Sequence, residues 1–200
     1  MSSVAEVIAD ALEAAGVKAV FGIPSVHNIG FYNVLKDRPG IQHILCRHEV
    51  SATQMADGYA RSGKGLGVVI SSTGPGASLT VSPLLEAYYS CSPVLSMTSN
   101  IPINFIGQGK GTLHEFNSQD VLFKEVTKKT FSVRSTENVK AQVEDIIQTA
   151  LSGRRGPVYL EVPVNFWAEE ATGDASSASN LTDGTVPDLA AAVQLLAKAK

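Results

Sequence analysis

The chain has 200 residues, a formal net charge of −3 and 44% hydrophobic side chains. This apolar content is enough for one ordinary globular domain. The sequence has no clustered run of Lys or Arg, so we do not expect nucleic acid as a partner. No stretch is long and apolar enough to cross a membrane. Residues 1–16 carry acids at helical spacing instead of the pattern of a signal peptide, so we expect a cytoplasmic protein.

Helical and strand patterns alternate along the first half of the chain. A helix is predicted to start after the potential cap Ser3 and to stop at Gly16. Apolar runs predict strands, and amphipathic stretches between them predict helices. The expected strands are 18–23, 41–46 and 66–71. The expected further helices are 28–35, 49–61 and one that follows the turn 73–76 and reaches about residue 89.

The same alternation continues in the second half. We expect strands at 93–98, 131–134 and 157–162, a helix at 139–151, and a long irregular segment at about 99–118. Several of the strands are apolar on both faces, which is typical of a parallel sheet covered on both sides. The sequence therefore predicts an α/β fold, with a parallel sheet of about six strands and helices on both faces.

A change of composition marks the end of this domain. We assign residues 1–168 to the domain and 169–187, rich in Ala, Ser, Thr, Gly and Asp, to a linker. Helical pattern resumes at 188–200 and resembles the opening of a further domain.

Four segments are expected to meet at one rim, because ligands of open parallel sheets collect at the carboxyl ends of the strands. These segments are 22–25, 47–49, 72–76 and 99–114.

Glu49 stands where a strand is expected to end and a helix to begin. A glutamate in a first helical turn often only complements the helix dipole. The following helix, however, has a smooth face of Ala52, Ala56 and Ala60, which permits close approach by a neighbouring helix or subunit. A carboxylate at such a contact is poorly solvated and tends to hold or share a proton.

The turn Thr73-Gly74-Pro75-Gly76 joins a strand to a helix. Its glycines permit close backbone approach, and the helix offers free N–H donors, although an ordinary tight connection has the same composition. The chain has neither GxxxxGK[ST] nor a GxGxxG between strand and helix, which argues against a nucleoside triphosphatase and a dinucleotide-binding domain.

Four motifs in order together resemble a known family. They are Val20-Phe21-Gly22-Ile23-Pro24, Arg47-His48-Glu49 with 55–61 (MADGYAR), Ser72 to Ala77 (STGPGA), and Gly156 to Pro163 (GPVYLEVP). Over about Val4 to Trp167 the chain resembles the N-terminal pyrimidine-binding domain of thiamine-diphosphate enzymes such as acetolactate synthase, benzoylformate decarboxylase and benzaldehyde lyase.

The resemblance implies roles for particular residues. The glutamate matching Glu49 hydrogen-bonds N1′ of the aminopyrimidine and thereby activates the cofactor, while Pro24 and the turn Thr73, Gly74, Pro75 and Gly76 would lie against the cofactor. It also implies a thiamine-diphosphate-dependent lyase or transferase acting on 2-oxo acids. The diphosphate and its Mg²⁺ would be held by another domain, so no metal ligand is expected in this chain. Family enzymes build the site between subunits, which implies a homodimer or homotetramer.

The substrate is expected to contact two further segments. The first is Ser25, Val26 and His27, next to the first strand, where His27 would be near the reactive carbon or would cap a helix. The second is His114, Glu115 and Phe116 in the long irregular segment, which could equally be a solvated surface. His48 is expected to point elsewhere and to be structural.

The exact reaction stays open. Acetolactate synthase has glycines where this chain has Ser25 and Val26, and a glutamine where it has Asn100. These differences disfavour acetolactate synthesis and the FAD of that enzyme. Two alternatives are a non-catalytic regulatory or binding module with the same fold, which would not need Glu49, and the pyrimidine-binding subunit of a two-subunit decarboxylase.

Overall fold

The computed structural model describes residues 2–173 and 188–199 of the chain, and its centre is one parallel sheet. Six strands lie side by side in the order β2-β1-β3-β4-β6-β5, all parallel. The predicted α/β class and strand number are therefore confirmed. The strands are β1 (Ala19–Gly22), β2 (Gln42–Leu45), β3 (Gly67–Ser71), β4 (Val94–Asn100), β5 (Thr130–Ser132) and β6 (Val158–Pro163).

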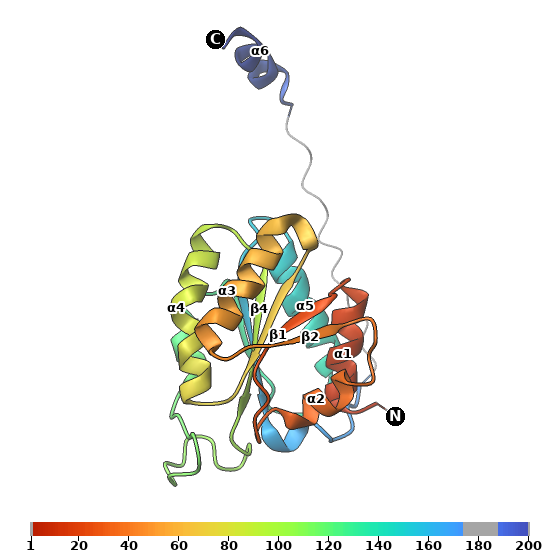
Figure 1. Cartoon of the computed structure of the whole chain (residues 1–200), viewed down its shortest axis with the longest axis vertical. Helices are drawn as coiled ribbons and strands as arrows, with labels where there is room; N and C mark the ends of the chain where they lie inside the picture. The colour runs from red at the N-terminus through yellow and green to blue at the C-terminus, as the bar shows by residue number, and fades with distance from the viewer. Residues whose placement is uncertain (1, 174–187, 200) are drawn as a thin grey trace.

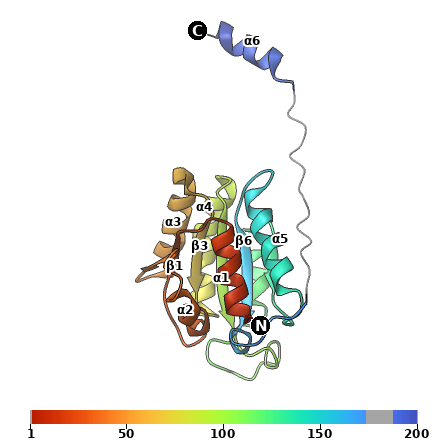
Figure 2. The same ribbon diagram turned by 90° about the vertical axis from the view of Figure 1, so that its right-hand side faces the viewer.

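Helices cover both faces of the sheet, as Figures 1 and 2 show. Side chains of α1, α2 and α5 form one apolar core with the sheet, and those of α3 and α4 form a second core on the opposite face. These helices are α1 (Val4–Ala14), α2 (Ile29–Leu35), α3 (Glu49–Tyr59), α4 (Pro75–Tyr89) and α5 (Val139–Leu151); short helical segments cover Ala60–Lys64, Gln119–Phe123 and Val164–Phe166.

Local sequence accounts for the bounds of α1. The Ser3 side chain accepts a hydrogen bond from the Glu6 N–H, and the Glu6 carboxylate accepts one from the Ser3 N–H, so two free donors of the first turn are satisfied. Gly16 follows the helix with a φ of +77°, a conformation that glycine adopts without strain. The predicted cap and stop are both confirmed.

The small-residue face of α3 lies inside the chain. Ala52, Ala56 and Ala60 are buried in the core beneath α3 and α4, and a Cβ on Gly67 of β3 would come within 2.1 Å of the Ala56 carbonyl oxygen. The expected close approach is therefore made to this chain's own sheet and α4. This face is not available to another subunit, because close packing within the domain already uses it.

The C-terminal part of the chain is described only in pieces. Residues at the start of the expected linker still pair with the domain: the Val4 N–H donates to the Glu169 carbonyl, and the Ala171 N–H donates to the Ser2 carbonyl. The remainder of that linker, 174–187, lies outside the described residues. The helix α6 (Ala190–Lys198) buries none of its residues. Within the described residues, no helix combines the length and the apolar character that a membrane span requires.

The strand order reverses beside β1. From β1 the chain passes through α2 to β2 on one side, and β2 then leads through α3 to β3 on the other side of β1. In such sheets, ligands bind where the strand order reverses. The loops that follow β1 and β3 border this point, so the fold brings together the segments that contain His27, Glu49 and Gly74.

Candidate functional site

Glu49 begins α3 at this edge and is half-buried. A Cβ placed on Gly76, in the first turn of α4, would lie 3.4 Å from Oε1 of Glu49. The carboxylate therefore faces the start of α4, and glycine at position 76 leaves room beside it. Within the described residues, the Glu49 carboxylate accepts no hydrogen bond from the chain, while its backbone carbonyl accepts one from the Thr53 hydroxyl (2.9 Å).

His48 has a structural role, as predicted. Its Nδ1 accepts a hydrogen bond from the Val50 N–H (3.2 Å), and the residue is the N-cap of α3. This contact fixes the first turn of α3, which in turn sets the direction of Glu49.

The turn Thr73-Gly74 is enclosed by the segment after β4. Gly74 has a φ of +56°, and a Cβ on it would lie 2.3 Å from the His114 carbonyl oxygen. Only glycine fits both this backbone conformation and this contact. The segment 101–118 thus packs on the turn through its backbone at His114.

His27 and His114 come together from two distant segments. Their rings stack with centroids 5.4 Å apart, His27 is 7% exposed, and Nδ1 of His27 lies 3.5 Å from the Ser72 hydroxyl. Burial and the nearby His114 lower the pKa of His27, which favours its neutral form. A neutral imidazole can accept or donate a proton at this rim.

The loop after β1 is fixed by its own side chains. Oδ1 of Asn28 accepts from the Ser25 N–H (2.7 Å), and its Nδ2 donates to the Ile23 carbonyl (3.1 Å). Trp167 donates its indole N–H to the His27 carbonyl (2.8 Å). Ser25 is therefore part of an ordered loop, whereas Pro24 is exposed and Val26 is 69% exposed.

The other expected substrate residues differ in their surroundings. His114 is exposed, with a φ of +62°, and Phe116 is 38% exposed. The Glu115 carboxylate accepts hydrogen bonds from the N–H and the hydroxyl of Thr112 (2.9 and 3.1 Å). The backbone contact to Thr112 lowers the pKa of Glu115. Glu115 thus closes its own loop, and His114 is the member of this group that lies against His27.

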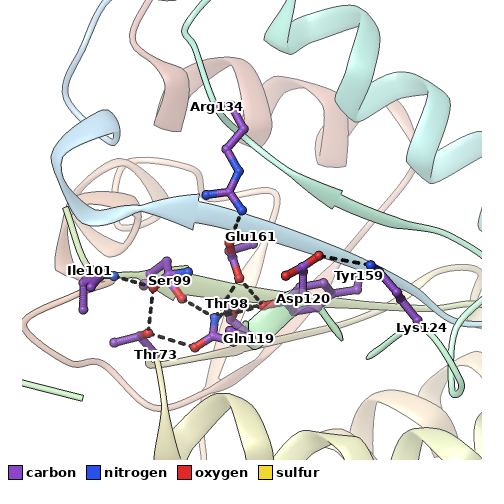
Figure 3. A network of polar contacts seen from close by, with 11 residues as sticks. Thr73, Thr98, Ser99, Ile101, Gln119, Asp120, Lys124, Arg134, Tyr159 and Glu161 are labelled. Atoms are coloured by element: carbon purple, nitrogen blue, oxygen red, sulfur yellow. Dashed lines mark hydrogen bonds and ion pairs between the residues drawn. The ribbon is translucent and has the colours of Figure 1, made fainter. Parts of the chain in front are cut away.

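A buried polar network lies beneath the turn and was not predicted from the sequence (Figure 3). Its centre is Gln119, whose carboxamide oxygen accepts from the Thr73 hydroxyl (2.8 Å) and the Gly74 N–H (2.6 Å). Its Nε2 lies within hydrogen-bonding distance of acceptors on β4 and β6, namely Thr98 Oγ1, the Ser99 carbonyl, Tyr159 OH and Glu161 Oε2.

One signal for this network exists in the sequence. Glu161 is the single charged residue in the otherwise apolar run of β6, and a buried carboxylate requires polar partners. The partner Gln119 belongs to no motif and lies 42 positions away, so only the fold identifies it.

Taken together, the rim offers a carboxylate that accepts no hydrogen bond from the described part of the chain, a tight glycine turn and two stacked imidazoles. Such a set can exchange a proton with a planar nitrogen base at Glu49 and with a second reactant near His27. The groups come from the loops after β1, β2, β3 and β4.

Comparisons with known proteins agree with this geometry. The family described as "Thiamine pyrophosphate enzyme, N-terminal TPP binding domain" matches residues 2–121. The probable acetolactate synthase large subunit of Methanocaldococcus jannaschii is 38% identical over 161 residues, which is 80% of this chain and 26% of that protein. The acetolactate synthase isozyme 2 large subunit of Escherichia coli K12 is 34% identical over 202 aligned positions, covering 98% of this chain and 35% of that protein.

A solved structure shares the fold. The thiamine diphosphate-dependent 4-hydroxybenzoylformate decarboxylase of Rhodococcus jostii RHA1 superposes with a TM-score of 0.78 at 28% identity, over 87% of this chain and 32% of that one. The chain thus spans about a quarter to a third of the length of the relatives it matches.

Proposed function

Because the chain belongs to the family of N-terminal TPP-binding domains of thiamine pyrophosphate enzymes, we propose that it binds and activates the aminopyrimidine of thiamine diphosphate. The complete enzyme would be a 2-oxo-acid decarboxylase or carboligase. The observation that carries the proposal is the half-buried Glu49 carboxylate, which faces Gly76 and makes no hydrogen bond within the described residues.

The residues present fit an aminopyrimidine. A side chain at position 76 would fill the space beside Glu49 Oε1, and a Cβ there would also lie 3.1 Å from the Ser72 Cβ. Glycine keeps this space open for a flat ring. Glu49 would hold the ring nitrogen N1′, and the turn Thr73 to Gly76, with Pro24 from the loop after β1, would lie against the ring.

When bound, thiamine diphosphate would supply a nucleophilic thiazolium C2 and an electron-accepting thiazolium ring, which is the chemistry that decarboxylation of a 2-oxo acid requires. Glu49, in the first turn of α3, would hold and move the proton at N1′, and its half-buried setting limits competition from water.

The 2-oxo acid would lie on the side of His27 and His114. Ser25 and Val26 border this side from the loop after β1, and Phe116 can add an apolar contact from the segment after β4. The stacked imidazoles can bind the carboxylate of the substrate or move a proton.

Further features of the complete enzyme belong to the same proposal. The domain would cover about residues 1–168, with 169–187 as a linker and 188–200 as the start of a further domain, although Glu169 and Ala171 still pair with the first residues of the chain. Mg²⁺ and the diphosphate would be held outside this chain, FAD is disfavoured, and the enzyme would be a cytoplasmic homodimer or homotetramer. Exposed Leu79, Leu85 and Tyr89 on α4 and Met55 on α3 supply apolar surface for another subunit.

The substitution Glu49→Gln in the full-length enzyme tests the proposal. The amide keeps the shape of the side chain but cannot exchange a proton with N1′. We expect thiamine diphosphate still to bind, while deuterium exchange at C2 of the bound cofactor slows by roughly 100- to 10,000-fold.

Glu144→Gln on α5 is the matched control, because it makes the same chemical change on the opposite face of the sheet. It should leave both binding and exchange unchanged. An exchange rate in Glu49→Gln equal to that of the wild type would remove Glu49 from this role.

A further inference from the structure

We propose that Gln119 is a positioning residue that holds the turn Thr73-Gly74 in its cofactor-binding shape, and that buried Glu161 fixes the orientation of its carboxamide. This inference rests on the proposed function, since it assigns a task to the turn that would contact the pyrimidine. Gln119 belongs to none of the motifs that indicate the family, and Glu161 lies in the motif Gly156 to Pro163, where the resemblance assigns it no role.

The contacts of Gln119 allow only one orientation of its amide. The Gly74 N–H is purely a donor, so the group 2.6 Å from it must be the carboxamide oxygen. On the other side, the Ser99 carbonyl and Glu161 Oε2 lie 2.9 and 3.1 Å from Nε2. The Ser99 carbonyl is purely an acceptor, and the Glu161 oxygen accepts as a carboxylate, so these two contacts require the two N–H groups. A flipped amide would lose all three contacts.

Glu161 occupies an unusual position for a carboxylate. It is fully buried in β6, where its Oε2 lies within hydrogen-bonding distance of Nε2 of Gln119 and of the Tyr159 hydroxyl (3.1 Å each). Its Oε1 has no hydrogen-bond partner within the described residues and lies 3.6 Å from Nη2 of Arg134. Burying a carboxylate is unfavourable unless it is paired and hydrogen-bonded. Orienting Gln119 gives this charge a task that an apolar residue could not perform.

The network connects the turn to the rigid part of the sheet. Thr98 and Ser99 belong to β4 and Tyr159 and Glu161 to β6, and these neighbouring strands pair in register over six residue pairs. The Gln119 side chain thereby holds the Gly74 N–H and the Thr73 hydroxyl against the centre of the sheet. Thr73 Oγ1, whose contact with Gln119 can be followed in Figure 3, also lies 3.5 Å from Asn100 Oδ1 on β4. Loops that are fixed in this way keep their ligand contacts without reorganisation on binding.

The test replaces the carboxamide by a carboxyl group of the same shape. In Gln119→Glu, two carboxyl groups face each other, and at low pH they can share one proton. The protonated pair can still accept the Gly74 N–H. As the pH rises, the shared proton is lost and the two charges repel, which should release the turn. In Gln119→Glu/Glu161→Gln, the amide and the carboxylate exchange places, so repulsion is absent at every pH.

Other titratable groups around the pair are unchanged in all variants. Tyr159 on β6 contacts both positions, Arg134 lies behind Glu161, and Asp120 pairs with Lys124 next to Gln119 on its own helical segment. A difference between the single and the double variant therefore reports the repulsion between positions 119 and 161.

Two measurements follow the turn. The first is the hydrogen-exchange rate of the Gly74 amide, measured by NMR on this chain and expressed as the ratio of the variant rate to the wild-type rate at each pH. In Gln119→Glu this ratio should rise about tenfold or more between about pH 5 and pH 8. The dissociation constant of thiamine diphosphate in the full-length enzyme should rise over the same range. In the double variant both ratios should stay flat.

The outcomes separate the parts of the proposal. If Gly74 exchange in Gln119→Glu matched the wild type at every pH, the contact between Gln119 and the Gly74 N–H would be overturned. If the double variant showed the same pH dependence as Gln119→Glu, the orienting role of Glu161 would be overturned. Faster exchange with unchanged cofactor affinity would overturn the positioning role alone. A wild-type enzyme that does not bind thiamine diphosphate would overturn the proposed function as well. If Gln119→Glu does not fold at neutral pH, folding of the double variant supports the proposal, and failure of both contradicts it.

Discussion

At the scale of single residues, the availability of Glu49 depends on its neighbours. The helix cap is supplied by His48, so the Glu49 carboxylate does not have to bond back to the helix start as Glu6 does in α1. Gly76 leaves the space in front of it free. A glutamate in a first helical turn is common, but Glu49 accepts no hydrogen bond at its carboxylate within the described residues, so it is not needed to cap the helix.

His114 and Glu115 are adjacent in sequence but should respond differently to substitution. Because His114 stacks on His27 at the rim, His114→Ala in the full-length enzyme should change the relative kcat/KM of two 2-oxo acids by about tenfold or more, with the cofactor dissociation constant nearly unchanged. Because Glu115 closes its own loop on Thr112, Glu115→Ala should lower the rates for all substrates alike. A panel of 2-oxo acids decides between these effects. Equal falls for every substrate in His114→Ala would contradict a specificity role.

At the scale of elements, the two glycines of the turn before α4 should differ in what they tolerate. In Gly74→Ala the new methyl would meet the His114 carbonyl at 2.3 Å at a φ of +56°, so we expect a loss of unfolding free energy of about 2–4 kcal/mol. In Gly76→Ala the new methyl would lie 3.1 Å from the Ser72 Cβ and 3.4 Å from Glu49 Oε1. The better helix propensity of alanine would offset up to about 1 kcal/mol of the cost of these contacts.

The two variants therefore separate folding from binding. Chemical denaturation of the chain should show Gly74→Ala as strongly destabilised and Gly76→Ala as close to the wild type. In the full-length enzyme, Gly76→Ala should nevertheless weaken thiamine diphosphate binding, because its methyl group occupies the space beside Glu49. Unchanged affinity in Gly76→Ala would contradict the placement of the pyrimidine.

The sequence predicts an element well where the residues that determine it lie close together in the chain, and poorly where they lie far apart. The helices α1 and α5 and the buried strands follow from caps and periodicity within a few residues, and their predicted bounds agree with the structure to within about three residues. The segment after β4 has no periodicity, and its contacts with the turn join residues far apart in sequence, such as Gly74 with His114. Gln119 was missed for the same reason, since its partners lie on the β3–α4 turn, β4 and β6.

At the scale of the whole molecule, the described residues form a closed fold, whereas the active centre that we propose needs groups from outside this chain. Both faces of the sheet are covered, and each has its own apolar core. The rim contributes Glu49, the turn and the imidazoles, all on one side of the ligand that we propose. The relatives are about three to four times longer than the part this chain matches, which leaves ample chain to supply the other side.

This contrast leads to a prediction for the chain by itself. It should unfold cooperatively, because its two cores are closed, yet show no turnover with thiamine diphosphate, Mg²⁺ and pyruvate. Contacts to the pyrimidine alone give little affinity after the loss of translational and rotational freedom, which is estimated at about 4 kcal/mol or more. Denaturation curves and a carbon dioxide release assay on purified chain provide the two readouts, with the full-length enzyme as the positive control. If the wild-type chain alone released carbon dioxide robustly, and the Glu49→Gln chain did not, the site would need no further domain.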